Sequence, residues 1–203
     1  MGRKSLRVVR RKEIIIGLYE TAKEIGLENA SIAKVASRLE INPSLILHYF
    51  KTRDEMMTAL IEFILEKYSD IYKVEGNGIQ STKKLYKLID NLFSRKWNEL
   101  FDDGVFYSCY SLIYRDDEIR RTFKILHDSL REWLIDAIKD AKENDIVHVE
   151  NEVETAEVIF ALIEGAYYYL GMVDNKKEYQ RKLKYFKKQA LKLLNVPEQE
   201  EIS

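Results

Sequence analysis

The chain has 203 residues, of which 46% are hydrophobic and 33% charged, so it is long and apolar enough to bury a substantial core. No run approaches the roughly 18 consecutive apolar residues of a membrane-spanning helix, which predicts a soluble protein without a membrane partner. The net charge of -1 hides an asymmetry, because residues 1–53 carry 11 Lys and Arg against 5 Asp and Glu, while the rest carries 22 against 29. This asymmetry indicates that one end of the chain meets a polyanion.

Cysteines, prolines and glycines are few in this sequence. Cys109 is the only cysteine, which excludes an internal disulfide and fits a reducing compartment. The beginning of the chain is basic and no apolar segment follows, which is unlike a secretory signal, so we expect a cytoplasmic protein. Two prolines and eight glycines favour long helices, and the sequence predicts an all-α fold of about nine helices.

The first predicted helix follows a loose basic arm. We expect the arm over residues 1–9 and the helix over roughly 10–25, with Gly26 as its C-cap. Its apolar face is predicted from four residues at helical spacing: Ile14, Leu18, Ala22 and Ile25.

The next two helices are short and follow each other closely. Ser31 can cap the second helix through its hydroxyl, and Asn42 with Pro43 is a strong start signal for a third. Ile46 and Phe50 are four residues apart and should enter a small core. Two short helices joined by a tight turn form a helix-turn-helix, which places its second helix in the major groove of DNA.

The remaining elements are predicted mainly from capping residues and apolar spacing. Thr52 should cap a helix over 53–73, the segment 74–78 is a linker candidate, and Ser81 should cap a helix ending near 101 at the Asp-Asp-Gly of 102–104. The other expected helices span about 105–114, 116–143, 152–173 and 176–194.

Residues 10–57 resemble the DNA-binding domain of the TetR family of bacterial transcriptional regulators. The stretches that match the pattern of that family are Gly26, SIAKVASRL, EIN, ILHYF and RDEM. The resemblance implies a DNA-binding domain over 1–53 and a helical ligand-binding and dimerisation domain over 54–203, linked by the helix at 53–73. Glu40 stands where the family has a turn glycine, and Leu47 replaces a tyrosine.

The resemblance also implies which residues meet DNA. The phosphate contacts that it implies come from Ser31, Lys34, Tyr49 and Arg53. Independently of the resemblance, the basic start of the first helix leads us to expect a phosphate contact from Arg11. The residues expected nearest the base edges are Pro43, Ser44, Leu45 and His48, and Leu47 offers an additional apolar contact.

The helices after residue 80 are rich in aromatic side chains. Ordinary core packing explains such residues, and a small-molecule pocket between helices, which the resemblance implies, is the alternative. The candidate pocket residues are Phe93, Trp97, Phe106, Tyr110, Tyr114, Phe123, His127 and Tyr167.

The last two helices predict a homodimer interface. The helix at 152–173 is apolar nearly all round, and that at 176–194 has a narrow apolar seam amid lysines, although burial within one chain would satisfy either helix alone. The candidate interface residues are Phe160, Tyr167, Tyr179, Leu183, Phe186 and Ala190.

Catalysis, cofactors and metals find little support. The three histidines lie in separate segments, and no Glu-x-x-His pair, Cys/His cluster or phosphate-binding glycine loop is present. We therefore expect a non-enzymatic transcriptional regulator, a repressor that binds a palindromic operator as a dimer and is released by a small-molecule effector. One alternative is a helical ligand-binding or assembly module that has lost DNA binding, and another is an enzyme with its active site in a helical bundle.

Overall fold

The computed structural model describes residues 3–72, 81–94 and 102–196. Within these ranges the chain forms nine α-helices and two short 3-10 helices and contains no strand, which confirms the predicted all-α fold. The helices group into two compact units. Unit 1 comprises the described residues of Met1–Tyr68 and Asn98–His127, and unit 2 those of Ser69–Trp97 and Asp128–Ser203.

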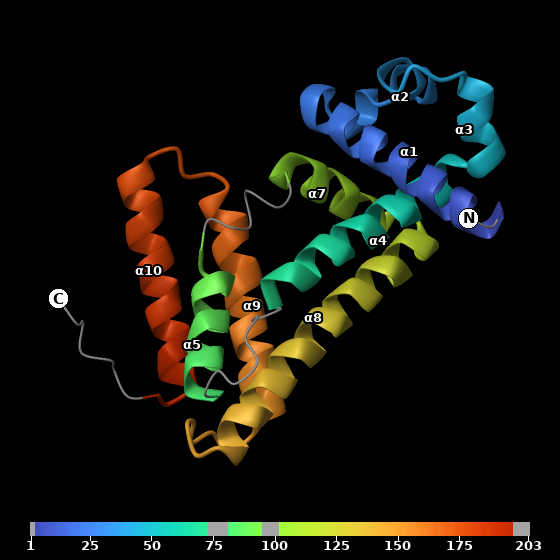
Figure 1. The fold of residues 1–203 in the computed structure, drawn as a ribbon. Helices are drawn as coiled ribbons and strands as arrows, with labels where there is room; N and C mark the ends of the chain where they lie inside the picture. Colours follow the sequence, from blue (N-terminus) through green and yellow to red (C-terminus); the bar gives the residue numbers. More distant parts are fainter. Residues whose placement is uncertain (1–2, 73–80, 95–101, 197–203) are drawn as a thin grey trace. The chain divides into compact units, whose positions relative to one another are not determined.

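Unit 1 holds the predicted helix-turn-helix (Figure 1). Its elements are α1 (Arg3–Ile25), η1 (Leu27–Asn29), α2 (Ile32–Arg38), α3 (Pro43–Tyr49), most of α4 (Arg53–Tyr72), α7 (Asp103–Tyr110), η2 (Ser111–Tyr114) and the first turns of α8 (Asp117–Glu143).

The helical spacing of apolar residues in α1 produces its buried face. Ile14, Leu18 and Ala22 are each at most 3% exposed, as predicted. Burial of a side chain as large as Ile or Leu stabilises the fold by about 1.5–3 kcal/mol. Ile25 is 37% exposed, so its assignment to the core was wrong. The reason is that α1 ends there and Gly26 turns the chain with a φ of 81°.

The predicted loose arm is wrong for the described residues 3–9, because α1 already begins at Arg3. No glycine or proline lies between Arg3 and Gly17, so nothing in this stretch stops the helix. Ion pairs further along stabilise it, from Arg10 to Glu13 at 2.6 Å and from Lys12 to Glu66 of α4 at 2.7 Å.

Asp102 begins a helix. Its side chain accepts a hydrogen bond from the Val105 amide and thereby caps α7, while the helix end that was predicted just before it lies outside the described residues. The Asp102 amide donates to the Tyr19 hydroxyl at 2.7 Å, which joins the start of α7 to α1. The predicted helix at 105–114 is α7 followed by η2.

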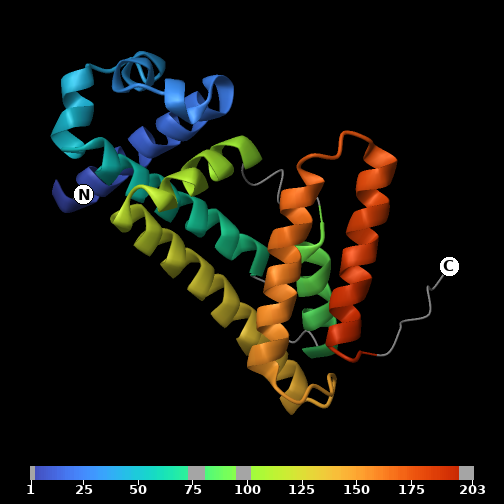
Figure 2. The same ribbon diagram turned by 180° about the vertical axis from the view of Figure 1, so that it is seen from behind.

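Unit 2 contains α5 (Ser81–Leu92), the remainder of α8, α9 (Glu152–Leu170) and α10 (Lys176–Leu193). In both ribbon views α5, α9 and α10 lie side by side (Figures 1 and 2). Asn151 and Asn175 cap α9 and α10 through two backbone amides each. The predicted linker at 74–78 lies outside the described residues.

The end of α5 differs from the prediction. We expected a helix to about residue 101, but α5 ends at Leu92. The Tyr167 hydroxyl lies 2.9 Å from the carbonyl oxygens of both Leu92 and Ser94, and the Ser94 hydroxyl donates to the Asn91 carbonyl. The single proton of the Tyr167 hydroxyl can go to either carbonyl, and the Ser94 hydroxyl satisfies that of Asn91, which a longer helix would have used.

Candidate nucleic-acid interface

The helix-turn-helix is organised by two capping side chains. The Ser31 hydroxyl accepts a hydrogen bond from the Lys34 amide at 3.3 Å, and the Asn42 side chain accepts from the Ser44 amide at 2.9 Å. Pro43 occupies the first turn of α3, where its missing amide hydrogen costs nothing. Both helix starts were predicted correctly because these interactions are local.

The turn between α2 and α3 is tight and contains a strained residue. Glu40 has a φ of 54°, in the left-handed region that usually favours glycine. Its amide donates to the Ser37 carbonyl, and the Ile41 amide donates to the Ala36 carbonyl. The turn therefore forms with a glutamate where the resemblance led us to expect glycine.

The two sides of α3 differ in their exposure. Ile46 and Phe50 are both fully buried, which confirms the prediction that they enter the small core. The opposite side bears four exposed residues, Pro43, Ser44, Leu47 and His48, while Leu45 and Tyr49 are half-buried. Leu47 is 52% exposed, so this side of α3 also presents an apolar side chain to solvent.

Arg11 is engaged inside unit 1. Its guanidinium donates to the Tyr49 carbonyl at 2.6 Å and to the Glu55 carboxylate at 2.7 Å, and lies 4.0 Å from the centre of the Phe50 ring. These contacts hold the end of α3 against α1 and α4. Arg11 was predicted to contact DNA, and Glu55 was not predicted as a partner, although the Thr52-x-x-Glu55 spacing is typical of a capping box.

Glu55 is the acidic partner in this arrangement. The Arg11 guanidinium, followed by the Lys51 amide, holds the pKa of the Glu55 carboxyl below its ordinary value of 4.5. The carboxylate is therefore charged at neutral pH and fixes the guanidinium in place.

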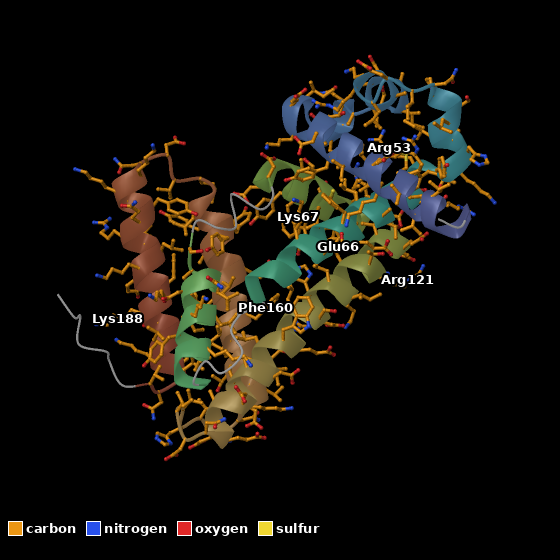
Figure 3. The ribbon with its side chains drawn as sticks, viewed as in Figure 1. Arg53, Glu66, Lys67, Arg121, Phe160 and Lys188 are labelled. Atoms are coloured by element: carbon orange, nitrogen blue, oxygen red, sulfur yellow. The ribbon has the colours of Figure 1, made fainter. Side chains whose placement is uncertain are left out.

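Arg53 lies at the start of α4 among the helices of unit 1 (Figure 3). It is exposed, and its guanidinium donates to the Leu27 carbonyl of η1 at 3.2 Å. Within the described part of unit 1, the exposed cations Lys34 and Lys51 have no ion-pair partner and remain available to a polyanion.

Comparisons with known proteins identify the family of this chain through its C-terminal part. Residues 80–196, more than half of the chain, match the family described as Tetracyclin repressor-like, C-terminal domain. The chain belongs to the TetR family.

Relatives of this TetR-family chain include HTH-type transcriptional regulators. BetI 1 of Chromohalobacter salexigens is 28% identical over 97 residues, which cover 47% of this chain and 48% of the relative. PksA of Bacillus subtilis is 21% identical over 159 residues, 77% and 76% of the two chains. The chain thus spans about half the length of the BetI 1 relative that it matches.

Structures of TetR-family and related regulators share the fold. A TetR regulator from Haloarcula marismortui superposes with a TM-score of 0.78 at 17% identity, covering 93% of this chain and 97% of that one. A transcriptional regulator from Saccharomonospora viridis, determined in complex with choline, gives a TM-score of 0.72 at 13% identity, covering 89% and 95%.

The predicted effector residues of this TetR-family chain fall into both units. In unit 1 the rings of Phe106, Tyr110, Phe123 and His127 contact one another, with centroids 5.5–6.4 Å apart. Tyr114 of unit 1 is 80% exposed. In unit 2, Phe93 is buried and Tyr167 is half-buried, while Trp97 lies outside the described residues. The pocket itself stays a prediction.

The predicted dimer residues are largely covered within unit 2. Phe160, Tyr179, Leu183 and Ala190 are at most 8% exposed, whereas Phe186 is half-buried. They pack in the interior that α9 and α10 share, so the intramolecular alternative accounts for their burial, and a role in dimerisation stays a prediction.

Two further features bear on function. Cys109 is fully buried, and burial raises the pKa of its thiol to about 12, so it packs as a small side chain of the core. Among the described residues, no group of three or more potential ligands could hold a metal ion, and no helix is long and apolar enough to cross a bilayer.

Proposed function

We propose that this chain is a dimeric, ligand-responsive repressor that binds operator DNA through α3. The observation that carries the proposal is the two-sided exposure of α3: Ile46 and Phe50 anchor it, and Ser44, Leu47 and His48 lie exposed on the other side. A short helix that is packed against the protein on one side and exposed on the other can insert into a major groove of DNA.

Different groups around α3 would contact the base edges and the phosphates of the DNA. Ser44 and His48 offer hydrogen bonds to base edges, Pro43, Leu45 and Leu47 offer apolar contact with a thymine methyl, and Ser31, Lys34, Tyr49 and Arg53 contact phosphates. Arg11 acts mainly by holding α3, through the Tyr49 carbonyl and Glu55.

Two copies are needed because one short helix reads too few bases. A two-fold dimer reads a palindrome whose half-sites are about one helical turn apart. We assign the interface to the last two helices, with a stripe on the exposed side of α9 and its C-terminal turn as the central contact. The stripe has spacing 3-4-3-4 and comprises Val158, Ala161, Gly165, Tyr168 and Met172.

The stripe suits a second copy of the chain. Val158, Tyr168 and Met172 are 52–64% exposed, and a side chain at Gly165 would meet no atom within 4 Å, so a partner helix can approach closely. The residues first predicted for the interface then support this surface from inside unit 2.

An effector would act as a ligand that binds one of two conformations more tightly. It can shift DNA binding only by its difference in affinity between them. The structural relative with bound choline supports the proposal that this fold accommodates a small molecule.

Selection of bound duplexes from a random pool, followed by titration at several salt concentrations, tests DNA binding. Lys34→Gln should weaken binding to every sequence and reduce the salt slope by about one. Lys87→Gln is the matched control, because Lys87 is an exposed lysine on α5 of unit 2 and should leave both quantities unchanged. Absence of binding even at low salt would favour the assembly-module alternative.

A further inference from the structure

Unit 1 contains a pocket of about 420 Å³ apart from the proposed DNA-reading face of α3. Its walls come from η1, from the first turns of α4, and from the junction of α7, η2 and α8. The volume lies within the range of about 300–1,000 Å³ that small-molecule sites usually have.

The floor of the pocket is apolar and well supported. Leu27, Met57 and Ile119 line it and are each at most 4% exposed, and Leu112 adds a half-buried apolar side chain. Such a surface accepts the hydrocarbon part of a ligand.

Two charges on the rim lack partners. In the described part of the chain, neither Arg115 nor Asp54 forms an ion pair, with each other or with any other residue. Several other charges of unit 1 are paired, such as Lys12 with Glu66. An unpaired cation and an unpaired anion on one pocket can each be satisfied by a group on a bound molecule.

The other charged groups of the pocket already form hydrogen bonds, and the Glu28 carboxylate accepts one from the Asn29 side-chain amide at 3.3 Å. The Asp116 carboxylate accepts from the amides of Glu118 and Ile119 at the start of α8, at 2.8 and 3.0 Å. Arg53 donates one bond to the Leu27 carbonyl and keeps further donors.

These charges restrict the class of ligand. A simple anion would be attracted by Arg115 and Arg53 but repelled by the carboxylates of Glu28, Asp54 and Asp116, and a simple cation would be attracted by the carboxylates but repelled by the two arginines. A molecule with both charges and an apolar body matches the whole lining.

We propose that this pocket binds a small zwitterion with an aliphatic body, such as an aliphatic amino acid. Its acid group binds Arg115 and Arg53, its ammonium group binds Asp54, and its hydrocarbon part covers Met57 and Leu112.

The site has a consequence for DNA binding, which rests on the proposed function. Arg53 is also a proposed phosphate ligand, so the acid group of the zwitterion and a DNA phosphate compete for one guanidinium. The bound ligand must then lower the affinity for DNA by the same factor by which bound DNA lowers the affinity for the ligand.

The binding test uses the full chain without DNA, so that failure of DNA binding does not affect it. Calorimetric titrations use L-valine, L-leucine, L-isoleucine and L-methionine, together with the leucine analogues 4-methylpentanoate and isopentylamine, which each keep one charge. At least one amino acid should bind with saturation, and the two single-charge analogues should bind at least about ten-fold more weakly than L-leucine.

Variants locate the site. Arg115→Gln and Asp54→Asn should each weaken amino-acid binding at least about ten-fold. Arg120→Gln is the matched control, because Arg120 is exposed on α8 and pairs with Asp117 outside the pocket lining. Because Asp54 also lies in the first turn of α4, thermal unfolding of the unliganded variant checks that the unit is folded.

Three outcomes overturn the proposal: no saturable binding of any of the four amino acids, equal binding of 4-methylpentanoate and L-leucine, or unchanged binding by folded Arg115→Gln and Asp54→Asn. In a separate titration, a saturating concentration of the amino acid should weaken DNA binding by the wild-type protein. Undiminished DNA affinity would contradict the competition at Arg53 and leave the binding site itself supported.

Discussion

Glu40 adopts the left-handed conformation in the turn that orients α3. A non-glycine residue there costs about 1–2 kcal/mol, and glycine avoids this cost. The chain nevertheless closes the turn, because the amides of Glu40 and Ile41 both reach carbonyls of α2.

Glu40→Gly should therefore stabilise unit 1. The relief of strain exceeds the additional entropy of glycine in the unfolded chain, and we expect a net gain of about 0.5–1 kcal/mol in the free energy of unfolding. Urea denaturation measures it. Ser37→Gly is the control, because a glycine inside α2 should lower the free energy of unfolding. A loss of stability in both variants would contradict the strain argument.

Glu55 makes the stability of unit 1 depend on pH. Because its folded-state pKa is lowered, its contribution is fully present above the ordinary value of 4.5 and is lost as the pH falls through the lowered pKa. With side chains 29% and 37% exposed, the Arg11–Glu55 pair is partly screened by solvent, and a contribution of about 0.5–1 kcal/mol is expected.

Glu55→Gln should consequently lower stability at pH 7 and converge with the wild type as the pH falls well below 4.5. Urea midpoints between pH 7 and 3 provide the comparison. Glu62→Gln, an exposed position further along α4, should show no such convergence. A constant difference between Glu55→Gln and wild type at all pH values would show that the lost interaction is not ionic.

At the scale of the helices, local capping made most starts predictable. Ser31, Asn42 and Thr52 each act on amides two or three residues ahead, so their effects are readable from the sequence. The end of α5 was not readable, because the hydroxyl that can satisfy its Leu92 carbonyl belongs to Tyr167, 75 residues later in the chain.

In the candidate interface too, local features were predictable and contacts with distant residues were not. Helical spacing correctly predicted that Ile46 and Phe50 are buried, and thus which side of α3 is exposed. The contacts of Arg11 were missed because its partners lie 38 and 44 residues away, and a basic residue near a DNA-binding motif looks the same in either role.

At the scale of the whole molecule, the central question is the assembly. Charges at Leu183 would not test it, because that side chain is only 8% exposed and the change would disturb unit 2 itself. The exposed stripe on α9 permits a cleaner experiment.

Val158→Glu should convert the proposed dimer into a monomer with unchanged helix content. Val158 is 52% exposed, so the charge is tolerated in one chain but would be buried at the proposed interface. Val153→Glu is the matched control on the same helix, since Val153 is 44% exposed and lies off the stripe. Sedimentation measures the mass, and a surviving Val158→Glu dimer would exclude this surface.

Unit 1 is discontinuous in sequence, since it joins the described residues before Tyr68 to those of 102–127. During synthesis on the ribosome, the helix-turn-helix therefore emerges well before the segments that complete its surroundings. Met57 and Leu27 remain uncovered on one side until α7 and the start of α8 have been translated. Nascent chains that stop before residue 102 should thus depend on chaperones more than their small size suggests.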